Sequence, residues 1–321
     1  MFKVLITGGT GTLGKKLTEL LLKNDPIISK IYIYSRDEYK QYQMNKEFEN
    51  NKKISYFVGD VRDKDRLYRA FNGIDYVIHT AALKHVPSCE YNPFEAVKTN
   101  IIGSANIIDA AIDQKVKKVL AISTDKAVNP INLYGCTKAC MEKMFIDGNN
   151  YSGDNSTIFS VVRYGNVIGS RGSVIPFFKK IAKEGGKFPL TDNEMTRFWT
   201  TIDNAAKFVL DSLEIMEGQE IFIPKLPTLK ISDLIKAIKE DAEIKVIGVR
   251  KGEKIHETLI SKEESKCFLD MNNYFIITQN APISSFEPFE YTSKNNDDYL
   301  SIEEMRKLLW MKIVKKWHMK N

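Results

Sequence analysis

The sequence predicts an α/β fold, with a doubly wound parallel sheet followed by a smaller mixed C-terminal lobe. In the first half, short runs rich in β-branched residues alternate with longer amphipathic runs. The strand runs are almost wholly apolar, as expected for a sheet that helices cover on both faces. From about residue 166 this alternation gives way to loops, short helices and isolated strand pairs. We therefore expect one domain over 1–165 and a lobe over 166–321 that partly interleaves with it.

Each predicted element follows from the spacing of its apolar residues. Strands are short and rich in Val, Ile and Tyr, whereas helices are longer and repeat their apolar residues every three or four positions. The predicted strands are Lys3–Thr7, Lys30–Tyr34, Ser55–Gly59, Tyr76–Thr80, Lys117–Ser123 and Ser160–Arg163. The predicted helices are Lys15–Lys23, Arg66–Phe71, Pro93–Gln114 and Leu133–Asn149.

The composition narrows the class of protein. No apolar run is long enough to cross a bilayer, and MFKVLITGG enters a strand at once, so we expect no membrane span and no signal peptide. The four cysteines form no CxxC pair, and Cys136 and Cys140, one helical turn apart, have no nearby His, which predicts reduced thiols, a cytoplasmic protein and no metal site. The net charge is +6, but Lys and Arg are scattered, so an anionic small molecule or a solvated surface fits better than nucleic acid.

A glycine-rich turn follows the first predicted strand. Its glycines, spaced G-x-x-G-x-x-G, allow a tight turn that brings backbone N–H groups to a pyrophosphate at a helix N-terminus. An ordinary strand-to-helix turn is the alternative, but the position between the first strand and a helix is the one that dinucleotide binding in a Rossmann-type sheet requires. The expected cofactor contacts here are Gly8, Thr10, Gly11, Thr12, Leu13 and Gly14.

The residues after the second strand favour NADP over NAD. NAD enzymes usually place an acid there for the ribose 2′-hydroxyl, whereas Arg accommodates a 2′-phosphate. Here the strand ends in Ser35 and Arg36, with Lys40 one helical turn later. In the alternative, Asp37 serves NAD and both cations are solvated. Further cofactor contacts are expected after strands three and four, at Asp60, Val61, Ala81 and Ala82.

Two groups of polar residues predict the catalytic end. Thr124, Asp125 and Lys126 follow the fifth strand, where ligands bind in open parallel sheets. Tyr134 and Lys138 then lie one turn apart on the same face of a helix, where the ammonium would favour the phenolate and contact the nicotinamide ribose. The alternative for Asp125 and Lys126 is a structural ion pair or helix cap.

These motifs, in this order, resemble the extended short-chain dehydrogenase/reductases. Most nucleotide-sugar dehydratases of that group carry Thr-Asp-Glu after strand five, and the Thr-Asp-Lys variant is similar to the UDP-N-acetylglucosamine 4,6-dehydratases. The resemblance extends from residue 3 to about residue 306; Thr12-Leu13 and Cys136 depart slightly from the family's pattern. Segments that carry it are Ser-Arg-Asp-Glu (35–38), Ala-Leu-Lys-His-Val-Pro-Ser-Cys-Glu (82–90), Lys-Thr-Asn-Ile-Ile-Gly (98–103), Arg-Tyr-Gly-Asn-Val (163–167), Glu-Met-Thr-Arg-Phe (194–198) and Arg-Lys-Gly-Glu-Lys (250–254).

The resemblance implies a redox-neutral dehydration with roles for particular residues. Tyr134 would take the sugar O4′ proton while NADP accepts the C4′ hydride, Lys126 in its neutral form would remove the C5′ proton, and Asp125 would protonate the departing C6′ hydroxyl. Burial and neighbouring cations are expected to lower the pKa of Lys126. The substrate contacts implied for UDP-N-acetylglucosamine are Lys84, Asn166, Val174, Arg197, Arg250 and Glu253.

Two features of the sequence favour one branch of the family that it resembles. The retained Tyr134 and the lack of a membrane-spanning extension favour the C5-inverting dehydratases that begin pseudaminic acid synthesis, with C5-retaining enzymes as the alternative. A nucleotide-sugar 4-epimerase or reductase on the same scaffold would leave Asp125 and Lys126 idle. A cofactor-sensing regulator would commonly lack Tyr134 or Lys138. The resemblance also implies a homo-oligomer, either a dimer or a hexamer.

Overall fold

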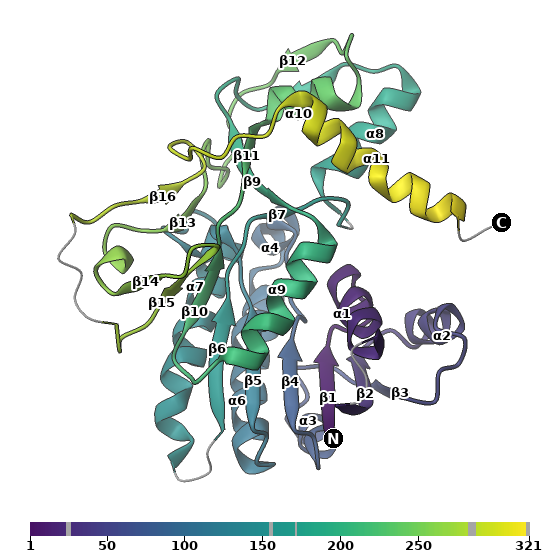
Figure 1. Cartoon of the computed structure of the whole chain (residues 1–321), viewed down its shortest axis with the longest axis vertical. Helices are drawn as coiled ribbons and strands as arrows, with labels where there is room; N and C mark the ends of the chain where they lie inside the picture. Colours follow the sequence, from purple (N-terminus) through teal and green to yellow (C-terminus); the bar gives the residue numbers. More distant parts are fainter. Residues whose placement is uncertain (24–26, 154–156, 171, 282–286, 319–321) are drawn as a thin grey trace.

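The predicted doubly wound sheet is present in the structure, a computed structural model that describes residues 1–23, 27–153, 157–170, 172–281 and 287–318, the last eight by backbone alone (Figure 1). The strands of the sheet lie in the order β14 (Phe268–Asp270), β15 (Tyr274–Ile277), β10 (Ile221–Pro224), β6 (Ile158–Val162), β5 (Lys118–Ile122), β4 (Tyr76–His79), β1 (Phe2–Thr7), β2 (Ile28–Ser35) and β3 (Ile54–Val58). Seven neighbouring strands of this sheet run parallel. At one edge β15 pairs antiparallel with β10, the last of the seven, and β14 pairs antiparallel with β15.

Helices cover both faces of this sheet because its strands are apolar on both sides. On one face α1 (Thr12–Lys23) packs against α9 (Ile202–Ile215), and on the other α3 (Lys64–Phe71), α6 (Gly103–Asp113) and α7 (Leu133–Asp147) lie side by side. Two short helices, α4 (Val86–Tyr91) and α5 (Pro93–Val97), precede α6. Fully buried Leu5, Ile6 and Phe159 are part of the core between these layers.

Two predicted helical regions differ from the structure. Helix α2 (Glu38–Glu47) was not expected, because only Gln41 and Met44 of its ten residues are buried and its sequence has no apolar stripe. The single helix expected over Pro93–Gln114 is interrupted at Lys98–Ile102 by a π-helical turn. Such turns are frequent at functional sites. Here the turn directs Asn100 to the loop after β4, where its amide exchanges hydrogen bonds of 2.8 Å with both the N–H and the carbonyl of Leu83.

A second, smaller core lies over the carboxyl ends of the strands, at the top of Figure 1. It is built around Phe178, Trp199 and Leu234. The elements there are β7 (Asn166–Val167), α8 (Val174–Glu184), β8 (Phe188–Leu190), β9 (Thr196–Thr200), β11 (Thr228–Lys230), α10 (Ile231–Ile238), β12 (Ile244–Val246) and α11 (Ile302–His318). The remaining strands, β13 (Thr258–Ile260) and β16 (Tyr291–Thr292), pair with each other.

The chain after residue 166 contributes to both parts, because α9, β10, β14 and β15 return to the large sheet. The expected division at 165/166, with partial interleaving, stays a prediction about domain organisation. Among the helices that the structure describes, none combines the length and the apolar character that a membrane span needs.

Candidate active site

A cleft of about 1340 Å³ lies between the carboxyl ends of the parallel strands and the smaller core. It brings together most of the residues singled out in the sequence. The two exceptions among the singled-out residues are Gly14 and Asp125, which are buried and do not line the cleft. Those that line it are Gly8, Thr10, Gly11, Thr12, Leu13, Ser35, Arg36, Lys40, Asp60, Val61, Ala81, Ala82, Lys84, Thr124, Lys126, Tyr134, Lys138, Asn166, Val174, Arg197, Arg250 and Glu253.

The glycine turn opens the N-terminus of α1 onto the cleft. Gly8 has φ +64°, and a Cβ there would lie 2.9 Å from the backbone of Ala81 after β4. At Gly14 a Cβ would lie 2.4 Å from the carbonyl oxygen of Gly9, so only glycine lets the helix start so close to the turn. A Cβ on Gly11 would meet only the Gly8 carbonyl within 4 Å, which leaves room for a ligand against the backbone. The turn therefore fits a pyrophosphate at a helix N-terminus.

After β2 the chain places the exposed cation Arg36 just before helix α2, which Asp37 caps. Asp37 is the N-cap of α2: its Oδ1 accepts from the Lys40 backbone N–H at 2.9 Å, and its Oδ2 pairs with Lys40 Nζ at 2.5 Å. These contacts hold the pKa of the Asp37 carboxyl below its usual value. The Arg36 side chain is 55% exposed and lies 3.6 Å from Asp60 Oδ2. Asp60 in turn is held by Arg62, with Nη2–Oδ2 at 2.7 Å.

Three contacts set the position of α7, which carries Tyr134 and Lys138. Asn132 is its N-cap, with Oδ1 accepting from the Gly135 N–H at 2.8 Å, and Glu90 of α4 accepts from the Leu133 N–H at 2.6 Å. A Cβ at Gly135 would lie 2.2 Å from the carbonyl oxygen of Lys126. The glycine therefore allows the first turn of α7 to pack directly on the backbone of Lys126, which brings Tyr134 close to that residue.

Tyr134 and Lys138 are both buried at the wall of the cleft. Burial raises the pKa of Tyr134 to about 12, although the charge of Lys126 and a hydrogen bond with Thr124 oppose the rise. Lys138 donates to the Ile122 carbonyl at 2.6 Å, and burial lowers its pKa to about 8. The cation that favours the Tyr134 phenolate in this arrangement is therefore Lys126, from the end of β5.

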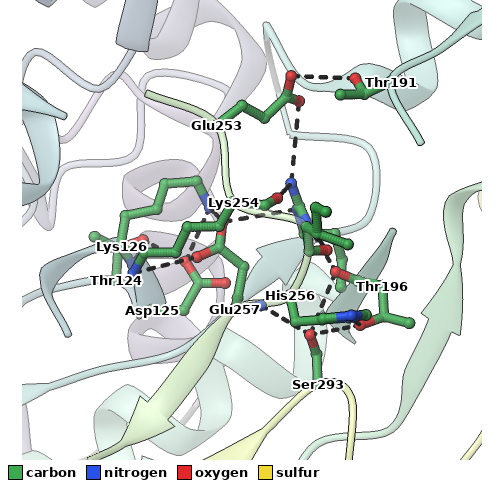
Figure 2. Close-up of polar contacts among 12 residues, drawn as sticks. Thr124, Asp125, Lys126, Thr191, Thr196, Glu253, Lys254, His256, Glu257 and Ser293 are labelled. Atoms are coloured by element: carbon green, nitrogen blue, oxygen red, sulfur yellow. Dashed lines mark hydrogen bonds and ion pairs between the residues drawn. The ribbon is translucent and has the colours of Figure 1, made fainter. Parts of the chain in front are cut away.

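Lys126 lies between two carboxylates at the end of β5 (Figure 2). Thr124 begins a short 3₁₀ turn over Asp125–Ala127, which folds the Lys126 side chain back so that its Nζ lies 3.0 Å from Asp125 Oδ1. Nζ also lies 3.2 Å from Oε1 of Glu257, a residue that the sequence analysis did not single out. Burial alone would lower the pKa of Lys126, but the charges of Asp125 and Glu257 outweigh it and raise the pKa. The expectation of a lowered pKa is wrong for this structure, and the ion pair weighed as the alternative is present.

Arg197 on β9 holds the segment that carries Glu257. Its Nη1 donates to the carbonyls of Thr196 at 2.7 Å and Ile255 at 2.9 Å, and its Nη2 donates to the Lys254 carbonyl at 2.8 Å. Glu253 accepts from the Thr191 hydroxyl at 3.1 Å and lies 3.9 Å from the exposed Arg250. The roles of Arg197, Arg250 and Glu253 in binding a diphosphate sugar stay predictions.

Glu257 and Lys254 are the site residues that sequence reasoning missed. Lys254 Nζ donates to the Val128 carbonyl at 2.5 Å and lies 3.9 Å from Glu257 Oε2. Lys254 is the last residue of the Arg-Lys-Gly-Glu-Lys segment and Glu257 follows three residues later, and no spacing rule connects either residue to the end of β5. The available signal was that Lys254 and Glu257 lie at or just after the Arg-Lys-Gly-Glu-Lys segment, from which Arg250 and Glu253 were already expected to contact the substrate.

Comparisons with known proteins agree with this architecture. The model of a family described as polysaccharide biosynthesis protein matches residues 4–279. An inverting UDP-N-acetylglucosamine 4,6-dehydratase of Campylobacter jejuni is 48% identical, over 94% of this chain and 95% of the relative. A UDP-glucose 4-epimerase of Rickettsia massiliae is 40% identical, over 95% of this chain and 94% of the relative.

A solved structure gives the same result for the fold. The X-ray structure of Pen from Bacillus thuringiensis is 40% identical, and each chain covers 98% of the other with a TM-score of 0.91. These matches confirm the resemblance to extended short-chain dehydrogenase/reductases that the motifs indicated. The chain belongs to the polysaccharide biosynthesis protein family, and within it is a homologue of the inverting UDP-N-acetylglucosamine 4,6-dehydratases.

Proposed function

We propose that the chain is an NADP-dependent UDP-N-acetylglucosamine 4,6-dehydratase that inverts C5 and forms UDP-2-acetamido-2,6-dideoxy-β-L-arabino-hexos-4-ulose. The observation that carries the proposal is that Tyr134 and Lys126 meet in the wall of the cleft, with the buried Asp125 paired to Lys126 at 3.0 Å. The similarity to the Campylobacter jejuni dehydratase over nearly the full chain supports the substrate and the outcome at C5.

The residues present fit a nicotinamide dinucleotide. The open glycine turn at α1 would hold the pyrophosphate, and Lys138 at the cleft wall would contact the nicotinamide ribose. The bound cofactor supplies reversible hydride acceptance. NADP is preferred over NAD because Asp37 is engaged as a helix cap while the exposed Arg36 is available to a 2′-phosphate. We expect Arg36→Ala to weaken binding of NADP more than binding of NAD, measured by fluorescence titration.

Tyr134 acts first, as the group that takes the O4′ proton. Its phenol must ionise for this, and burial opposes ionisation. The ammonium of Lys126 and the hydrogen bond with Thr124 favour it. The charged form of Lys126 therefore suits the first step of the reaction.

Asp125 and Lys126 act in the elimination. One proton shift along their existing 3.0 Å contact converts ammonium and carboxylate into a neutral amine and a carboxylic acid. The amine then takes the C5′ proton, and the acid protonates the leaving C6′ hydroxyl, so that no proton is gained or lost overall. Exclusion of water by a bound substrate favours this neutral pair, because low polarity disfavours separated charges. The sugar then needs a hydride at C6′, which the bound cofactor would return after accepting it from C4′, and a proton at C5′. The proton that Tyr134 took from O4′ balances the proton at C5′, and its delivery to the face opposite Lys126 gives inversion.

A proton spectrum of the product formed in deuterated water tests the proposal. We expect UDP-N-acetylglucosamine to lose water, to gain a C6′ methyl signal and to carry solvent deuterium at C5′ with inverted configuration. Retained configuration at C5′ would leave the dehydratase assignment standing and reject inversion.

A nucleotide-sugar 4-epimerase is the second candidate, because the Rickettsia massiliae relative carries that name. Epimerisation at C4′ needs no C5′ base, so Lys126 would have no role as a base in it and Asp125 none as an acid. The same spectrum separates the two, since an epimerase returns a sugar with its C6′ hydroxyl intact.

A cytoplasmic location and a homo-oligomeric state, dimer or hexamer, are further parts of the proposal. Sedimentation of the full chain tests the oligomeric state.

A further inference from the structure

Glu257 is a buried carboxylate at the edge of the cleft that the reaction outlined above does not use. It is 2% exposed, and its Oε1 lies 3.2 Å from Lys126 Nζ and 3.7 Å from Arg197 Nε. Its Oε2 has no hydrogen-bond partner within the part of the chain that the structure describes. Oε2 lies 3.9 Å from Lys254 Nζ, too far for a hydrogen bond. Burying a carboxylate oxygen without a hydrogen bond costs free energy, so the place of Glu257 beside Lys126 calls for a reason.

The backbone fixes the direction of this side chain. The N–H of Glu257 donates to Ser293 Oγ at 2.9 Å, and the N–H of Ser293 donates to the Glu257 carbonyl at 2.8 Å. Arg197 holds the carbonyls of Lys254 and Ile255 just before it. Figure 2 shows the result, with the carboxylate of Glu257 directed at the Lys126 amine.

Charged groups reach the Lys126 amine from each element around it. Asp125 lies on the same 3₁₀ turn, Glu257 and Lys254 come from the segment before β13, Arg197 comes from β9, and the phenol of Tyr134 comes from α7. Arg197 opposes a positive charge on Lys126, and so does burial. The two carboxylates favour that charge, and Glu257 is the one of them that takes no part in the proposed proton transfers.

We propose that Glu257 is a positioning residue, which holds the Lys126 amino group beside Asp125 and keeps it protonated in the resting site. The inference rests on the proposed function, because it assigns Lys126 and Asp125 to the chemistry and gives Glu257 the task of setting their starting state. An ammonium in the resting site favours the Tyr134 phenolate, and the contact at Oε1 keeps the nitrogen in place when its proton has passed to Asp125.

The direct test measures how readily Lys126 takes a label. The folded chain is treated with a trace of acetic anhydride, which acetylates neutral amines, and the extent at Lys126 is read by peptide mass spectrometry over a series of pH values. Loss of an opposite charge within hydrogen-bond distance shifts a pKa by about one unit or more, so Glu257→Gln should label about tenfold faster at the same pH. Glu257→Met removes the charge without adding a buried amide, and is expected to show the same increase if the Gln variant does not fold.

Matched variants separate this effect from a general loss of charge. Asp109→Asn removes a carboxylate that pairs with Lys64 at 2.7 Å on the surface of the α3–α6 layer, and we expect labelling of Lys126 to stay at the wild-type rate. Glu257→Asp keeps the charge and is expected to stay close to the wild type. An unchanged labelling rate in folded Glu257→Gln and Glu257→Met would overturn the inference.

Turnover gives a second readout. With UDP-N-acetylglucosamine we expect Glu257→Gln to lower kcat with little change in KM, and to move the pH limb that belongs to Lys126 to lower pH; Glu257→Asp is expected to restore the wild-type limb. A wild-type chain that releases no water from this sugar would instead reject the proposed function. The labelling comparison would still decide whether Glu257 controls Lys126.

Discussion

Two buried clusters of charge in the described part of the chain differ in how completely their polar atoms are satisfied. In the first, Arg163 is 1% exposed and donates to Glu142, to Glu264 and to the Leu259 carbonyl at distances between 2.6 and 3.1 Å. A guanidinium has five N–H groups, and these contacts use all of them. The cluster joins β6, α7 and the segment after β13 into one unit.

The second cluster is the one around Lys126, and it is left incomplete. Asp125 Oδ2 and Glu257 Oε2 are buried without hydrogen-bond partners in the described residues, and Lys126 faces the cleft. A fully satisfied network makes a structure rigid, whereas unsatisfied groups keep capacity for a ligand or a proton. Burial and ion pairing alone therefore do not mark a site. Unused hydrogen-bonding capacity beside a cleft does.

The largest expected effect is on turnover, from Lys126→Ala. Loss of an acid–base group lowers kcat by about 10²–10⁴-fold, and we expect dehydration measured by proton NMR to fall by that amount while NADP binding is unchanged. Turnover within tenfold of the wild type would mean that the incomplete cluster is merely structural.

Arg163→Met is expected to act on stability instead. Removing one partner of a buried ion pair leaves uncompensated charge and costs about 3–5 kcal/mol, to be measured as a lower urea midpoint. Arg250→Met is the control, because the Arg250 side chain is 58% exposed and its ion pair is worth roughly 1 kcal/mol or less. Equal midpoints for the two variants would contradict the assignment of the first cluster to the fold.

His79 extends the comparison to a buried group that stays neutral. It is 2% exposed, its Nδ1 lies 2.7 Å from Thr7 Oγ1, and burial lowers its pKa to about 3. The unfolded chain binds this proton below about pH 6.5, so stability falls as the pH drops from there toward about 3. In His79→Asn we expect the free energy of unfolding to change less steeply with pH in this range, by up to about 1.4 kcal/mol per pH unit. Urea unfolding at several pH values measures this slope. Parallel pH profiles would show that His79 is not the source.

The smallest expected effect is at the exposed carboxylate of Asp37. Replacing an N-cap residue with Ala costs about 1 kcal/mol, so Asp37→Ala should lower the thermal midpoint slightly. NADP binding should persist, because Arg36 remains. A variant that loses NADP binding altogether would show that Asp37 contacts the cofactor.

The sequence allowed prediction of the features that depend on local pattern. The strands β1 to β6, the glycine turn at Gly8 and the spacing of Tyr134 and Lys138 on one helix all follow from periodicity and motif. Helix α2 could not be predicted in this way, because its capping by Asp37 compensates for a polar sequence with no buried stripe.

The protonation state of Lys126 was out of reach for a different reason. Its pKa depends on Glu257, which lies far along the chain and is placed by β9 and Ser293. Burial and nearby cations were foreseen, but the second carboxylate that reverses their effect was not. Contacts of this kind are set by tertiary structure and leave no periodic signal.

The most direct test of the central claim is the fate of a deuterium placed at C4′ of UDP-N-acetylglucosamine. A redox-neutral dehydration moves this label to the C6′ methyl group of the 4-keto product, with no accumulation of reduced cofactor. Deuterium that stays at C4′ of a sugar with its C6′ hydroxyl intact would contradict the account.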